Sequence, residues 1–137
     1  MKKWFETSIR TRYSETDQGG IIHHASYAVY LEIARIEFFK TLGYEINALE
    51  KKKIFCPVVT LSLHYLKPLR SQEDIIIQIA LESFSKVRFC LAYQVIRDTE
   101  KIATASIVQC FLNEKFKPIP IPADLLERAQ FWCVDQI

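Results

Sequence analysis

Alternation of apolar and polar residues predicts five β-strands in this chain. The first is expected at residues 5–13, where charged or polar residues at the even positions alternate with mostly more apolar residues at the odd positions. A period of two is typical of a half-buried strand. Four further strands are expected at residues 58–66, 75–82, 87–96 and 102–112, and the same period is visible in the first three of them. One face of the resulting sheet is strongly apolar, so we expect another layer to cover it.

One segment has helical rather than strand spacing. Over residues 26–42 apolar side chains recur every three or four positions, and Gly43 follows where a C-terminal cap belongs. The apolar stripe is wider than one helix face, because it also includes Val29, Ile33 and Ile36. We therefore expect a long helix that protein encloses on several sides.

The remaining segments complete the predicted architecture. Short polar stretches at residues 66–74, 82–86 and 96–101 predict hairpins in an antiparallel meander. The run KPIPIP at 117–122 is expected to end the sheet, and a short helix is predicted at 124–132. The order of elements indicates an α+β fold, with a five-stranded antiparallel sheet wrapped around one long central helix. With no repeat or linker, residues 1–137 are expected to form a single domain.

Composition and charge narrow the class of protein. Eighteen basic and sixteen acidic residues nearly cancel, so nucleic acid is not the expected partner. No segment approaches the roughly 20 apolar residues of a membrane span, and the N-terminus lacks the apolar stretch of a signal peptide. We expect a soluble, cytoplasmic protein. An open sheet edge favours pairing between copies, so a homodimer or a homotetramer is expected.

The cysteines and histidines do not indicate a metal site. The four cysteines are scattered without a C-x-x-C pair, which favours reduced, mostly buried thiols. His23 and His24 are neighbours in sequence, and adjacent residues seldom point at one ion. His64 stands alone in a predicted strand. We therefore expect no metal.

The loop before the helix holds the main candidate for chemistry. Asp17 lies there among turn-forming residues, and on its own it would most simply be a turn or cap residue. However, the segment Asp17–Glu37, DQGGIIHHASYAVYLEIARIE, closely resembles the signature of the 4-hydroxybenzoyl-CoA thioesterase family. It is especially similar to the bacterial branch associated with the Tol-Pal system. The resemblance continues through Pro57–Val59 and Tyr65–Asp74 and implies a hotdog fold.

The resemblance implies roles for particular residues. Asp17 matches the catalytic carboxylate, which attacks the thioester carbonyl or activates water. His24 matches the residue whose backbone N–H holds the thioester oxygen, and a helix N-terminus does offer unpaired N–H donors to an oxyanion. The family places Tyr27 near the acyl pocket, and Gly20 and Val59 are further candidates for binding substrate.

Two basic residues and one departure from the family pattern complete this comparison. Lys86 and Arg88 occupy the region where relatives carry cations for the coenzyme A phosphates, although an ordinary solvated hairpin explains them equally well. Ser26 stands where many relatives have Asn, so a hydrogen bond made by that Asn need not exist here.

The function expected from the sequence is hydrolysis of an acyl-CoA with a short aliphatic or aromatic acyl group. No cofactor is expected, because coenzyme A enters as part of the substrate. Two alternatives stay open: hydrolysis of an acyl group carried by acyl carrier protein, and a non-catalytic acyl-binding or scaffold protein of lipid metabolism.

Overall fold

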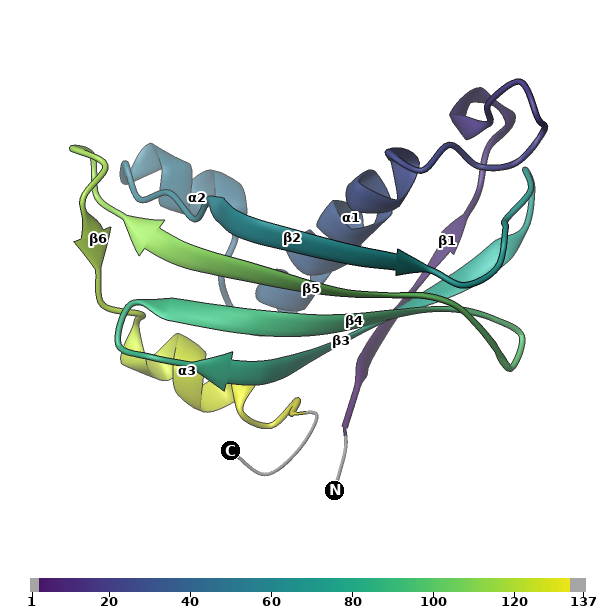
Figure 1. Ribbon diagram of the computed structural model, residues 1–137. Coiled ribbons are helices and arrows are strands. Elements are labelled where there is room, and N and C mark those ends of the chain that lie inside the picture. Colours follow the sequence, from purple (N-terminus) through teal and green to yellow (C-terminus); the bar gives the residue numbers. More distant parts are fainter. Residues whose placement is uncertain (1–2, 134–137) are drawn as a thin grey trace.

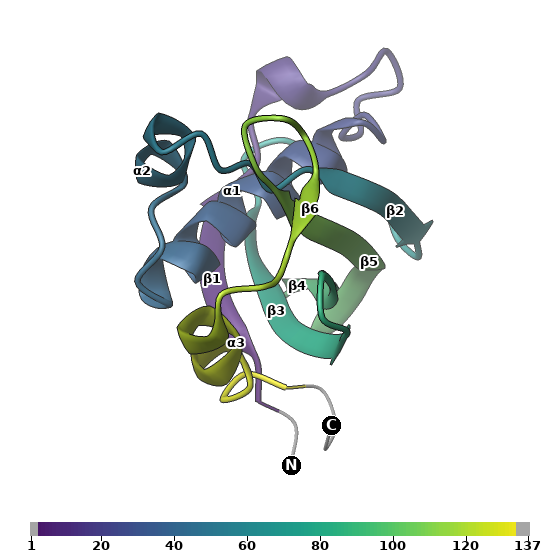
Figure 2. The ribbon, with the colours of Figure 1, turned by 90° about the vertical axis from the view of Figure 1, so that its left-hand side faces the viewer.

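The chain folds into a curved antiparallel sheet that wraps around a long helix, as Figures 1 and 2 show. The computed structural model describes residues 3–133. Its strands are β1 (Phe5–Arg10), β2 (Val58–Tyr65), β3 (Asp74–Phe84), β4 (Arg88–Arg97), β5 (Glu100–Leu112) and β6 (Pro118–Ile119). Its helices are the 3₁₀ turn η1 (Tyr13–Glu15), α1 (Ser26–Thr41), α2 (Ile46–Lys51) and α3 (Ala123–Ala129). The predicted α+β architecture is confirmed.

The strand order is β1-β3-β4-β5-β2, and it corrects two expectations. The meander holds only for β3, β4 and β5, because β2 pairs with β5 instead of β3. Residues 66–73 therefore form a crossover connection and not a hairpin. Within this connection, Leu69 O accepts the Ile22 N–H at 2.8 Å. In addition, the KPIPIP run does not simply end the sheet, because Pro118–Ile119 pairs with the end of β5.

Helix α1 fills the concave side of the sheet (Figure 2). Its buried side chains are Tyr27, Tyr30, Leu31, Ala34, Phe38 and Phe39. They pack with the inward rows of the central strands, of which Ile77, Ile79 and Leu91 are at most 1% exposed. Burial of each such side chain contributes roughly 1.5–3 kcal/mol. The helix ends at Thr41, and Gly43 follows just beyond its C-cap with a φ of +87°, which suits glycine.

The opposite side of α1 is open in the single chain. Val29, Ile33 and Ile36 are 50%, 43% and 40% exposed, so the expectation of a helix enclosed on several sides is wrong for one chain. The edge strand β2 is also uncovered, with Val58 and Leu61 each 44% exposed. We call these five side chains the α1–β2 apolar face. Such an uncovered set is typical of a protein interface.

Within residues 3–133 no helix is long and apolar enough to cross a membrane. The four cysteines carry free thiols. In the same part of the chain, no three His, Cys, Asp or Glu side chains gather as they would around a metal ion.

Candidate active site

Asp17 lies in a tight turn between η1 and α1. An antiparallel bridge joins Thr16 to Ile22, and the Asp17 N–H donates to Ile21 O at 2.9 Å. In the side chain, Oδ1 accepts the Gly19 N–H at 2.8 Å. Oδ2 accepts no hydrogen bond from the described residues, and the side chain is exposed. The carboxylate is thus oriented by one oxygen and left open at the other.

The two glycines of this turn serve different purposes, which predicts different outcomes for their replacement. Gly20 has a φ of +79°, and no atom lies within 4 Å of the place a Cβ would take, so Gly20→Ala meets backbone strain alone. We expect it to lower the free energy of unfolding by about 1 kcal/mol. A Cβ on Gly19 would lie 3.2 Å from Asp17 Oδ1. Gly19→Ala should therefore lower kcat more than stability, as urea denaturation and steady-state kinetics on both variants would reveal.

The start of α1 presents an unpaired N–H at His24. The N–H of Ala25 donates to His23 Nδ1 at 3.1 Å, and the N–H of Ser26 donates to His23 O at 2.9 Å. The N–H of His24 has no acceptor among residues 3–133. A free N–H at the positive end of a helix favours a developing negative charge. His23 therefore accepts the N–H groups of Ala25 and Ser26, while the donor of His24 stays available.

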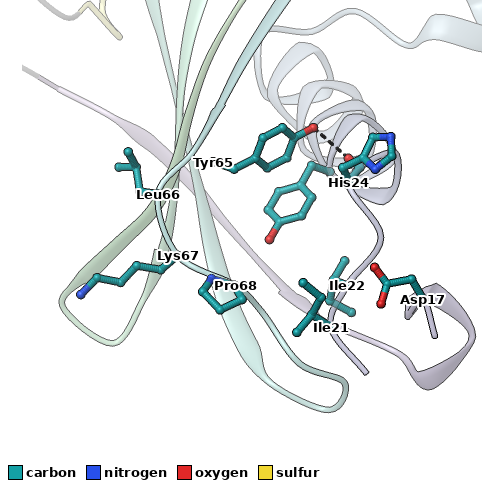
Figure 3. Close-up of a pocket in the computed structure, with 9 residues that line it drawn as sticks. Asp17, Ile21, Ile22, His24, Tyr65, Leu66, Lys67 and Pro68 are labelled. Atoms are coloured by element: carbon teal, nitrogen blue, oxygen red, sulfur yellow. Dashed lines mark hydrogen bonds between the residues drawn. The ribbon is translucent and has the colours of Figure 1, made fainter. Parts of the chain in front are cut away.

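Asp17 and His24 line one cavity of about 330 Å³. Its other lining residues are Ile21, Ile22, Tyr27, Tyr65, Leu66, Lys67 and Pro68. Figure 3 shows Asp17 and His24 on one side, with Tyr65 and Pro68 across from them. The Tyr65 hydroxyl donates to His24 O at 3.0 Å and so ties the end of β2 to the helix start. The lining combines apolar side chains of Ile21, Ile22, Leu66 and Pro68 with the polar side chain of Asp17.

Tyr27 and Lys67, which both line this cavity, differ in what they offer a ligand. Burial, and then the neighbouring Tyr65, raise the pKa of Tyr27 above its ordinary value, so its hydroxyl stays neutral. The rings of Tyr27 and Tyr65 pack nearly perpendicular to each other, with centroids 4.9 Å apart. The ammonium of Lys67 pairs with Glu100 and points away from Asp17 (Figure 3). The charge of Lys67 is therefore already paired, and Tyr27 lines the cavity as a neutral side chain.

The structure brings together only part of the predicted site. Asp17, His24 and Tyr27 share the cavity, whereas Gly20 shapes the adjacent turn without lining it. Val59 lies near the start of β2, at the far end from Tyr65.

Lys86 and Arg88 are also distant from the Asp17 cavity in the single chain. They belong to the β3–β4 hairpin, and Arg88 pairs with Cys110 at the same end of the sheet as Val58. Both cations are exposed, and neither forms an ion pair within the described part of the chain.

The sequence patterns missed one residue of this region, Glu15. Its carboxylate accepts a hydrogen bond from the buried hydroxyl of Tyr30 at 2.7 Å and forms an ion pair with Arg12. The Ser26 hydroxyl donates to Glu15 O at 3.4 Å. The only sequence signal is an acidic residue two positions before Asp17.

Comparison with known proteins points to one family. The sequence model of the thioesterase-like superfamily matches residues 11–129. A putative acyl-CoA thioesterase of Bacillus subtilis is 35% identical over 114 residues, which are 81% of this chain and 82% of that protein. A DHNA-CoA thioesterase of Staphylococcus aureus superposes with a TM-score of 0.82 at 32% identity, covering 85% and 80% of the two chains. A hypothetical protein of Aquifex aeolicus superposes with a TM-score of 0.87 at 28% identity, and the match covers 91% of this chain and 98% of that protein.

Proposed function

Because the chain belongs to the thioesterase-like superfamily and is a thioester hydrolase, we propose that its substrate is an acyl-CoA, which it cleaves to a free acid and coenzyme A. The fold is the predicted hotdog fold. The observation that carries the proposal is that Asp17, which has an open carboxylate oxygen, and His24, which has an unpaired N–H, line the same cavity. These are a base or nucleophile and an oxyanion donor, the two groups that thioester hydrolysis requires.

In the proposed reaction the thioester carbonyl oxygen binds the His24 N–H, which stabilises the negative charge as the carbonyl carbon is attacked. Asp17 Oδ2 either attacks that carbon itself or takes a proton from the attacking water. Direct attack expels the coenzyme A thiolate and leaves an anhydride, which water then hydrolyses. With water as the nucleophile, the tetrahedral intermediate collapses directly to the acid and the thiolate. Both routes balance with water as the only co-reactant. Because the thiolate is a good leaving group, neither route needs a cofactor.

We further propose that the working unit is a homodimer joined through β2, or a homotetramer made of two such dimers. The open edge of β2 and the α1–β2 apolar face support this arrangement. If two β2 strands pair antiparallel, the Val58 end of one lies beside the Tyr65 end of the other. The β3–β4 hairpin of one chain then lies on the same side as the Asp17 cavity of the other. Lys86 and Arg88 would meet the coenzyme A phosphates there.

The acyl group that we propose is short and aliphatic, or aromatic, because a cavity of about 330 Å³ suits a small group. Within the superfamily, we place the chain nearest to the 4-hydroxybenzoyl-CoA thioesterases of the Tol-Pal-associated branch. Support comes from the segment Asp17–Glu37. Acyl carrier protein is the alternative donor of the acyl group.

Release of free thiol from a panel of acyl-CoA esters tests this proposal. Acetyl, butyryl, hexanoyl, palmitoyl and benzoyl esters should be hydrolysed with kcat/KM highest for a short or aromatic member. The same acyl groups on acyl carrier protein form the comparison set. Preference for the carrier-protein esters would replace the proposed donor, and no turnover of either set by folded protein would overturn the proposed function.

A further inference from the structure

We propose that Glu15 is a positioning residue, which holds the Asp17 turn against the start of α1. This inference rests on the function proposed above. Glu15 does not line the cavity, so it acts through the two groups that do.

The backbone of Glu15 already joins the turn to the helix start. Its carbonyl oxygen accepts the N–H of His23 at 2.8 Å, directly before the oxyanion donor at His24. The same oxygen receives the Ser26 hydroxyl at 3.4 Å. Glu15 is two residues before Asp17, so a shift of Glu15 changes the distance between carboxylate and donor.

The side chain of Glu15 fixes that backbone in two directions. Oε1 accepts the Tyr30 hydroxyl at 2.7 Å and the Arg12 N–H at 2.8 Å. Oε2 accepts the Arg12 guanidinium through Nε at 3.2 Å and Nη2 at 3.1 Å. Tyr30 is fully buried on α1, whereas Arg12 lies just beyond β1. The carboxylate thus links the end of the first strand to the helix through the turn that carries Asp17.

The ionisation states of Glu15 and Tyr30 favour the hydrogen bond between them. Burial alone would raise the pKa of Glu15, but the hydrogen bonds from Tyr30 and Arg12 and the Arg12 charge lower it below its ordinary value. Burial, followed by the bond to Glu15, raises the pKa of Tyr30. The pair is therefore a neutral donor and a charged acceptor, which makes a stronger bond than two neutral groups. Because four donors engage its two oxygens, we assign Glu15 no direct chemistry.

Tyr30→Phe tests the link with the least disturbance, because it removes only the hydroxyl. Tyr44→Phe is the matched control, since the Tyr44 hydroxyl donates to Asp124 at 2.5 Å away from the cavity. We expect kcat to fall roughly 10- to 100-fold in Tyr30→Phe, with KM changed less than about twofold. Tyr44→Phe should retain wild-type kcat even where thermal denaturation shows that both variants lose stability.

Two further measurements separate positioning from general destabilisation. Glu15→Gln keeps an acceptor for Tyr30 and should retain more activity than Glu15→Ala. By NMR, the His23 amide should exchange at least about 10-fold faster in Tyr30→Phe than in wild type, and at the wild-type rate in Tyr44→Phe.

Equal kcat values and equal His23 exchange rates in the two tyrosine variants would overturn the positioning role. Wild-type protein that hydrolyses no thioester would overturn the proposed function instead. The exchange rates would then still decide whether Glu15 and Tyr30 hold the turn.

Discussion

Asp17→Asn is expected to lower kcat by roughly 10²- to 10⁴-fold, the contribution of a general base or nucleophile. The amide is neither a base nor a nucleophile at neutral pH. Its oxygen can still accept the Gly19 N–H that Asp17 Oδ1 accepts at 2.8 Å, so the turn should keep its shape. The exposed position of the side chain limits the change in unfolding free energy to about 0.5 kcal/mol. Thiol release and urea denaturation measure the two quantities.

The comparison variant for this experiment is Asp74→Asn. Asp74 is also an exposed carboxylate, and it pairs with Arg10 at 2.9 Å where β1 ends beside the start of β3. We expect its kcat to equal that of wild type. Retention of more than about a tenth of wild-type kcat by Asp17→Asn would contradict a catalytic role for this carboxylate and direct attention to another group in the cavity.

The elements that the sequence predicted well are those with strong local patterns. The inward residues of β3 and β4 alternate because α1 covers one face of the sheet, and Gly43 marks the end of α1 through its positive φ. Helix α2 (Ile46–Lys51) was missed because it is short and has no side-chain cap. The pairing of β2 with β5 was missed because alternation indicates which face is buried but not which strands are neighbours.

The candidate site shows the same division between local and distant information. The turn around Asp17 and the helix start at His24 are adjacent in sequence, so one motif predicted both. The hydrogen bond from the Tyr30 hydroxyl to Glu15 spans 15 positions and depends on how η1 docks on α1. Lys86 and Arg88 were expected near the substrate, yet strand register puts them at the other end of the sheet. Only a second chain would bring such residues to the cavity.

Leu61→Glu tests that second chain, and we expect it to yield folded monomers with at least about 10-fold lower kcat/KM. Leu61 is 44% exposed in the middle of β2, opposite Ile107 on β5. In a pair of antiparallel β2 strands the two glutamates would lie near each other, where like charges and loss of apolar contact oppose association. Analytical ultracentrifugation gives the mass, circular dichroism the fold, and thiol release the activity.

Phe131→Glu is the control for introducing a charge at an exposed apolar position. Phe131 is 57% exposed beside the Lys3 ammonium, and it lies beyond α3, away from β2. Its mass and activity should match wild type. A dimer of full activity with Leu61→Glu would show that β2 is not the interface. Monomers of full activity would show that one chain holds the complete site, and the coenzyme A phosphates would then need partners nearer to Asp17 than Lys86 and Arg88.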